Sequence, residues 1–251
     1  MSGWWRRSDG TVRAGRCRTH VDVFEHVFDH GGVETAALLD RLRAQVAQAE
    51  ARVRPQLLEV PAALAKVLPE PGLRPGATYC LDGAGALLQA LLAEPSAAGH
   101  WCGVVGVPTF AAEAAAAAGV RLERLVLVPE PGDQWLAVVG ALAEVIDVLA
   151  VRVPSRVRES DAARLGARLR DRGVVLLAIG DWPRAEARLR VTAPHWRGLG
   201  QGHGHLVSRR IRVEVTSRRS PAGRGVTVEL PAATGGLADV LVESTRLRVA
   251  G

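Results

Sequence analysis

Largely apolar runs of four to six residues recur along the middle of the chain, separated by segments with helical periodicity. The apolar runs are typical of buried parallel strands and lie at residues 78–81, 101–105, 125–128, 146–151 and 174–179. The helical segments are residues 86–94, 110–118, 134–143 and 161–171. Strands that alternate with helices in this way indicate a parallel sheet joined by right-handed helical crossovers. The pattern therefore predicts an α/β core.

The pattern changes beyond residue 182, where strand-like runs follow one another without helices. These runs are residues 188–192, 206–216, 226–230 and 246–249. The second run alternates charged and apolar positions, as a strand with one solvated face does. We expect these runs to form antiparallel strands that extend the parallel sheet.

An amphipathic helix is predicted ahead of the core, over residues 33–54, because Leu38, Leu42 and Val46 fall on one stripe. It is a candidate for docking or self-association. We divide the chain into three parts: an N-terminal arm with this helix, an α/β core, and a strand-rich C-terminal extension. Their boundaries are residues 1–71, 72–219 and 220–251.

Helix ends are signalled at three positions. Asp133 and Ser160 are predicted N-caps, because a short polar side chain there can accept a hydrogen bond from a free helix amide. Gly173 is predicted to end the helix that begins near residue 161, because glycine readily adopts the left-handed conformation found after helix ends.

The chain is basic, with a formal net charge of +6 and a pI near 10.4. This charge favours nucleic acid, an anionic surface or an acidic protein as a partner. A second interpretation stays open, because Lys66 is the single lysine and the arginines can simply stand in for surface lysines. No segment has the length and apolarity of a membrane span, which favours a soluble, cytoplasmic protein. Cys17, Cys80 and Cys102 lack a metal-binding or disulfide spacing and are expected to be free thiols.

The turn after residues 78–81 carries Asp82, Gly83 and Gly85 and opens the next helix. A glycine-containing turn between a strand and a helix is where α/β proteins hold phosphate on backbone amides. The lysine and the hydroxyl residue of a complete phosphate loop are missing. The turn is therefore predicted to be a degenerate phosphate-loop position.

The densest basic cluster is a candidate DNA-binding surface, although an arginine-rich solvated strand edge explains it equally well. It lacks interleaved aromatic residues, on which single-stranded nucleic acid stacks. Trp182 and Trp196 are candidate anchors for a protein partner, with burial as the alternative. The cluster consists of Arg209, Arg210, Arg212, Arg218 and Arg219.

The sequence contains no clear motif for a metal site or for catalysis. His20, His26 and His30 lie among acidic residues without the spacing of a ligand set, and His203 and His205 lack neighbouring carboxylates. We assign no metal and no cofactor. No nucleophile motif is present, and no catalytic residue is assigned.

Several stretches, taken in order, resemble the RecA-like superfamily, and in particular the ImuA-type proteins of bacterial mutagenesis cassettes. The stretches are GLRPGATYCLDG, HWCGVVGVPTF, AAEAAAAAGVRLERLVLV, VIDVLAV, GVVLLAIG and LVSRRIRVEVTSRR, within residues 72–219. The resemblance implies a three-layer RecA-like core with a mostly parallel sheet, extended by antiparallel strands and preceded by a helical segment. It also implies a Y-family DNA polymerase homologue, ImuB-like, as partner.

The chain departs from that family's ATPase motifs at each position where they would fall. Pro108 or a near neighbour lies where the family has its catalytic glutamate, and Arg152 lies near the position of the magnesium-linked acid. Gly180 or Asp181 replaces the glutamine that senses nucleotide. We therefore expect a pseudo-ATPase that acts as an accessory protein in translesion synthesis and SOS mutagenesis, with single-stranded DNA as a further partner. The alternatives are a divergent RecA-type ATPase and a SulA-like cell-division inhibitor.

Overall fold

The computed structural model describes residues 56–83, 85–154, 157–199, 204–233 and 236–239. The chain divides into two compact units, residues 1–54 and 55–251, and the described residues all lie in the second unit. The predicted helix at 33–54 and the predicted strand at 246–249 lie outside the described residues.

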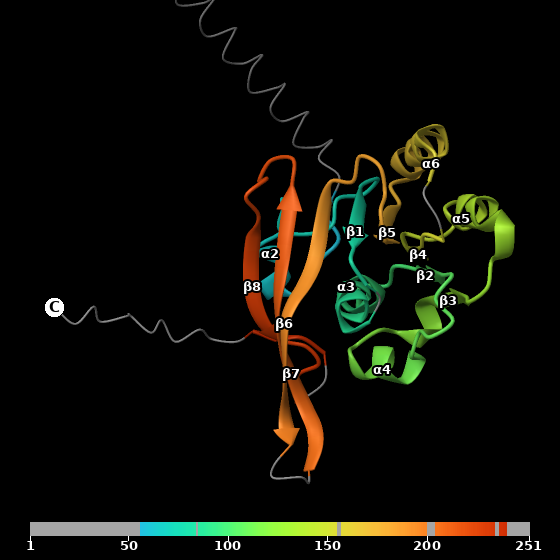
Figure 1. Ribbon diagram of the computed structural model, residues 1–251. Helices are drawn as coiled ribbons and strands as arrows, with labels where there is room; N and C mark the ends of the chain where they lie inside the picture. Colours follow the sequence, from blue (N-terminus) through green and yellow to red (C-terminus); the bar gives the residue numbers. More distant parts are fainter. Residues whose placement is uncertain (1–55, 84, 155–156, 200–203, 234–235, 240–251) are drawn as a thin grey trace, which may run out of the picture. The chain divides into compact units, whose positions relative to one another are not determined.

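A nine-stranded sheet forms the centre of the fold, in the order β3-β2-β4-β5-β1-β6-β7-β8-β9 (Figure 1). Neighbouring strands from β3 to β6 in this order are parallel, and the pairs from β6 to β9 are antiparallel. The predicted mostly parallel sheet with an antiparallel extension is confirmed. The strands are β1 (Thr78–Leu81), β2 (Cys102–Val105), β3 (Leu125–Val128), β4 (Val148–Arg152), β5 (Val175–Ile179), β6 (Ala187–Leu199), β7 (Gly204–Ser217), β8 (Arg224–Glu229) and β9 (Ala238–Asp239).

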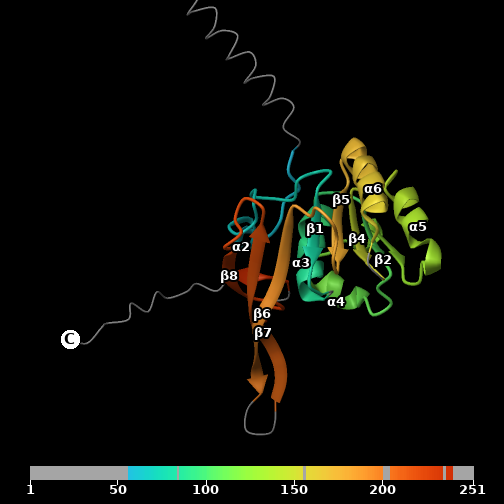
Figure 2. The same cartoon turned by 45° about the horizontal axis from the view of Figure 1, so that its top comes forward.

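Helices cover both faces of the parallel part of the sheet, which gives three layers (Figures 1 and 2). On one face, buried side chains of α3 and α4 share a core with strand residues such as Tyr79 and Val104, and α2 packs against the antiparallel strands β8 and β9. On the other face, α5 and α6 enclose a second core with Cys80 and Leu149. The helices are α2 (Ala62–Ala65), α3 (Ala86–Ala97), α4 (Ala112–Ala117), α5 (Trp135–Leu142) and α6 (Glu159–Arg172), with 3-10 turns η1 (Leu122–Arg124) and η2 (Gly132–Gln134).

Two predicted helix caps are wrong. Asp133 lies within η2, and α5 begins at Trp135 with no side-chain cap. Ser160 lies inside the first turn of α6, which begins one residue earlier behind Arg158. No side chain of the described residues caps the start of α6. Acidic residues in its first turn stabilise the helix start electrostatically. Gly173 ends α6 with φ of 70°, as predicted.

The segments on either side of the predicted core are part of its packing. Leu58 and Leu73 exchange two backbone hydrogen bonds of 2.9 Å, and Leu64 and Leu68 are buried in the first core. Beyond residue 220, β8 pairs with β7 in the same sheet and buries Val228. The described residues from 56 to 239 therefore share one sheet and its two cores.

The β6–β7 hairpin is longer than the sequence predicts, and its distal half extends beyond the helical layers (Figures 1 and 2). Irregular register between Thr192 and His195 shows a bulge in β6, where Ala193 has φ of 49°. The strand-breaking Ala193-Pro194 pair falls inside this bulge, which is why the sequence signal for β6 ends at Thr192 although the strand continues.

Candidate functional site

The turn between β1 and α3 lies at the carboxyl edge of the parallel sheet, where α/β proteins bind ligands. The Asp82 amide donates a hydrogen bond to the carbonyl of Leu189, and this ties the turn to β6. Gly85 precedes α3 with φ of 141°, a conformation that side chains disfavour. A pocket of about 180 Å³ opens here, lined by Asp82, Gly83, Gly85, Ala86, Leu87, Leu189, Val191 and Arg209.

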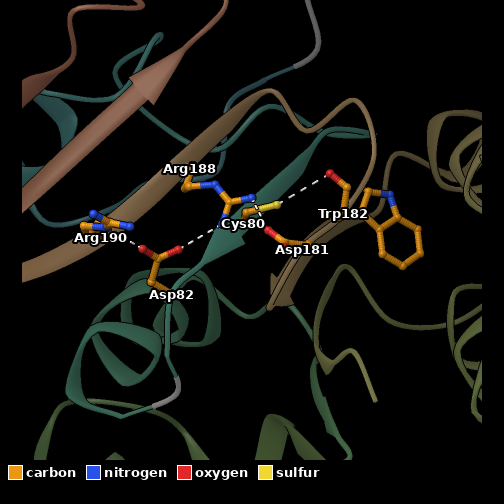
Figure 3. A network of polar contacts seen from close by, with 6 residues as sticks. All are labelled: Cys80, Asp82, Asp181, Trp182, Arg188 and Arg190. Carbon is orange, nitrogen blue, oxygen red and sulfur yellow. Dashed lines mark hydrogen bonds and ion pairs between the residues drawn. The ribbon is translucent and has the colours of Figure 1, made fainter. Parts of the chain in front are cut away.

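Two arginines of β6 bind the Asp82 carboxylate (Figure 3). Arg188 donates from one terminal nitrogen to Asp82 Oδ1 at 3.0 Å, and Arg190 Nε donates to Asp82 Oδ2 at 2.7 Å. The second terminal nitrogen of Arg188 donates to Asp181 Oδ1 at 2.5 Å. Both carboxylate oxygens of Asp82 therefore accept charge-assisted hydrogen bonds from the neighbouring strand.

The network changes the protonation of its members. Burial raises the pKa of Asp82, but hydrogen bonds from Arg190 and Arg188 outweigh burial and hold the pKa below its ordinary value. Burial lowers the pKa of Arg188, and its hydrogen bonds to Asp181 and Asp82 more than reverse this. Asp82 is therefore an anion at neutral pH, within a phosphate-loop-like turn.

This arrangement opposes phosphate binding in two ways. The Asp82 carboxylate repels an anion that approaches the α3 N-terminus, and it already binds Arg188 and Arg190. At the carboxyl end of β4 lies Arg152, which is in register with Ile179 of β5. A cation at this strand end disfavours a divalent metal ion at the same edge.

Trp182 does not lie on the surface. Its side chain is 6% exposed and packs edge-to-face against Trp135 of α5, with ring centroids 6.4 Å apart. Its carbonyl accepts a weak hydrogen bond from the Cys80 thiol at 3.8 Å. The prediction of Trp182 as a partner anchor is therefore corrected: the ring fills the core between α5 and the sheet.

The predicted arginine cluster is split between the two faces of β7. Side chains alternate along a strand, so Arg209 lies on the face of the buried Ile211 and Val213. Arg210 and Arg212 lie on the opposite face, which none of the described helices covers in Figures 1 and 2. The remaining two arginines follow the end of β7, where Arg219 pairs with Glu70 at 3.6 Å and Arg218 is exposed. Arg218 is nine positions further along the chain than Arg209, which corresponds to about 30 Å of extended strand.

The hairpin brings an aromatic ring to Arg209. Trp196 is its cross-strand neighbour, and the guanidinium lies 5.2 Å from the centre of the Trp196 ring. Arg209 Nε also donates to the Leu230 carbonyl at 3.0 Å, while Trp196 remains 45% exposed. Leu206 and Val207, on the same distal part of the hairpin, are also exposed. The sequence showed no aromatic residue beside the arginines, because Trp196 is on the other strand.

Sequence reasoning missed Arg188 and Arg190. Their signal is the alternation of basic and apolar residues in β6, which is typical of any strand with one polar face. What makes them part of the site is the parallel pairing of β6 with β1, in which Cys80 is in register with Arg188. Strand order is not visible in a single sequence.

Within the described ranges, no group of three or more His, Cys, Asp and Glu side chains is placed to hold a metal ion. In the same part of the chain, no helix has the length and apolarity needed to cross a membrane. The histidines at positions 20, 26, 30 and 203 lie outside the described residues.

The fold and the turn define an α/β protein with a phosphate-loop-like turn that is paired with its own neighbouring strand. Residues 66–184 are similar to the family described as the MT3502 N-terminal domain. The matched region ends just before β6, so it covers the parallel strands β1 to β5 and leaves out the β6–β7 hairpin. A comparison with curated proteins finds no match.

Proposed function

We propose that this protein is a non-catalytic, RecA-like accessory protein of DNA damage tolerance. It acts by binding a Y-family polymerase homologue of the ImuB type and contacts single-stranded DNA. The choice of pathway and partner rests on the sequence resemblance to ImuA-type proteins. The α/β architecture is compatible with that resemblance.

The observation that carries the non-catalytic part is the pairing of Asp82 with Arg188 and Arg190. A nucleotide phosphate at this turn would meet a carboxylate where a phosphate loop has backbone amides and a lysine. Arg152 at the end of β4 adds a second mismatch for magnesium-bound nucleotide. These features favour a binding protein over the alternative of a divergent ATPase.

Contact with single-stranded DNA is supported by the distal β6–β7 hairpin. Residues 187–213 contain no Asp or Glu. The exposed ring of Trp196 lies beside Arg209, so a stacking surface and a cation occur together. Arg210 lies on the opposite face of the same strand, and its buried Nε has no hydrogen-bond partner among the described residues.

Calorimetric titration with ATP, with and without magnesium, tests the absence of catalysis. We expect no binding heat and no phosphate release. Micromolar, magnesium-dependent affinity together with turnover would establish the ATPase instead.

Fluorescence anisotropy with a labelled single strand tests the DNA contact. Binding at low salt should weaken as salt rises, because the arginines release counterions. Co-purification with a Y-family polymerase homologue tests the partner. Co-purification with the GTPase of cell division would favour the SulA-like alternative.

A further inference from the structure

The outer surface of α5 is unusually apolar for a helix at the edge of a layer. All eight of its residues, from Trp135 to Leu142, are apolar. Only Trp135, Val139 and Gly140 are buried, whereas Ala137 and Ala141 are exposed. A helix that is apolar on every side is normally covered on every side.

A groove of about 340 Å³ runs between α5 and α6, which lie side by side in Figures 1 and 2. Leu136 and Gly140 of α5 and Leu165 of α6 supply its apolar lining, and Asp161, Arg164 and Arg168 supply its charged lining. Arg168 reaches across to α5, where it donates to the Gly140 carbonyl at 3.4 Å. A groove between two helices is the shape that receives a third helix.

The α6 side of the groove carries a net positive charge, because Arg164 and Arg168 outnumber Asp161 in its lining. Arg164, Arg168 and Arg172 follow one another at intervals of four residues and are exposed. Glu144 pairs with Arg168 at 3.5 Å and also with Arg172. No carboxylate of the described residues forms an ion pair with Arg164, so this side of the groove has a cation left for an incoming acid.

We infer that the α5–α6 groove binds an amphipathic helix of a partner protein, with acidic residues along the flank that faces Arg164. The apolar stripe of that helix covers Leu136, Gly140 and the exposed alanines of α5. The inference rests on the proposed function in one respect, which is that the protein has a protein partner. The docking surface lies in the helical layer opposite α3 and α4.

The test uses the full-length protein and two synthetic helical peptides. Both have leucines at spacings of three and four residues, one with glutamates along a flank and the other with lysines at the same positions. The native protein should bind the glutamate peptide at least ten-fold more tightly than the lysine peptide. In Arg164→Glu this preference should reverse, because the peptide charge then compensates the changed residue.

Ala141→Asp should lower the affinity for both peptides at least ten-fold, because it places a charge on the apolar face of α5. Ala116→Asp is the matched control: it makes the same change at an exposed helical alanine of α4, in the other layer, and should leave binding unchanged. Circular dichroism verifies that each variant folds.

Four results would overturn the inference. The first is that neither peptide binds, and the second is that the two peptides bind equally and Arg164→Glu does not change this. The third is that the native protein self-associates and Ala141→Asp does not, and the fourth is that the native protein binds anionic vesicles and Ala141→Asp does not. The third would assign the groove to a second copy and the fourth to a membrane surface. DNA anisotropy with Ala141→Asp should match that of the native protein, so failure of the groove and failure of the DNA contact are distinguishable.

Discussion

Trp196 and Arg209 face each other across the β6–β7 ladder, and the guanidinium stacks 5.2 Å from the ring centre. The pair joins the two side-chain types that bind single-stranded nucleic acid, an aromatic face and a fixed cation. The Trp196 ring is 45% exposed on the β6–β7 hairpin, where a strand of nucleic acid can approach it.

Trp196→Ala should weaken single-stranded DNA binding by about 1–3 kcal/mol, the usual effect of losing one stacking ring. Stability should change little, because the ring is 45% exposed. Trp101→Ala is a matched control, since Trp101 is 39% exposed and has Arg124 at 5.3 Å from its ring. Equal losses of DNA affinity in the two variants would contradict a specific role for the hairpin.

Trp182→Ala, unlike Trp196→Ala, should strongly lower the stability of the protein. Removing a ring that is 6% exposed and packed against Trp135 leaves a cavity, and we expect the free energy of unfolding to fall by about 3–5 kcal/mol. Urea denaturation measures this loss. A change below about 1 kcal/mol would mean that the ring is not packed in the core.

Asp82→Asn should free Arg190 and one terminal nitrogen of Arg188 for an external anion, while Asp181 still binds the other nitrogen of Arg188. The lost ion pairs are partly exposed and screened by solvent, so we expect only a small destabilisation. Sulfate should then raise the melting temperature of the variant more than that of the native protein. Glu159→Gln removes the exposed pair with Arg184, and this control should show no added sulfate effect.

The Asp82 carboxylate also makes the stability of the protein depend on pH in the acid range. Because the folded-state pKa of Asp82 is below the ordinary value of 3.8, its stabilising contribution is complete at neutral pH. The contribution is lost as the pH falls below about 4 towards the folded-state pKa. The difference in unfolding free energy between native protein and Asp82→Asn should therefore be constant near pH 7 and shrink below pH 4. A difference that grows on acidification would mean that the folded-state pKa of Asp82 is raised and not lowered.

The thiols of Cys80 and Cys102 should be unreactive in the folded protein. Both are buried, and burial raises the pKa of Cys80 and brings that of Cys102 to about 12. In a Cys17→Ser background, a thiol reagent should label the protein only when denaturant unfolds it. Rapid labelling of the native protein would place one of these thiols at the surface.

The sequence predicted the strands of the core well because their apolar runs are short and bounded by turns. The residues at 78–81 and 125–128 form β1 and β3 with no change of bounds. It predicted the site only in part. Asp82, Gly83 and Gly85 are visible as a turn, but their partners Arg188 and Arg190 depend on which strand lies next to β1. The sequence places Arg209 and Arg210 in one basic cluster because they are adjacent, although neighbours on a strand point to opposite faces.

The central position of β1 has a consequence for biosynthesis. Its two neighbours in the sheet, β5 and β6, begin at Val175 and Ala187, about a hundred residues later in the chain. While the ribosome makes the intervening segment, both edges of β1 lack these partners. We expect the sheet to close late in translation, when β5 and β6 insert on either side of β1. Truncation before residue 187 should accordingly leave a chain that aggregates, and not a smaller folded domain.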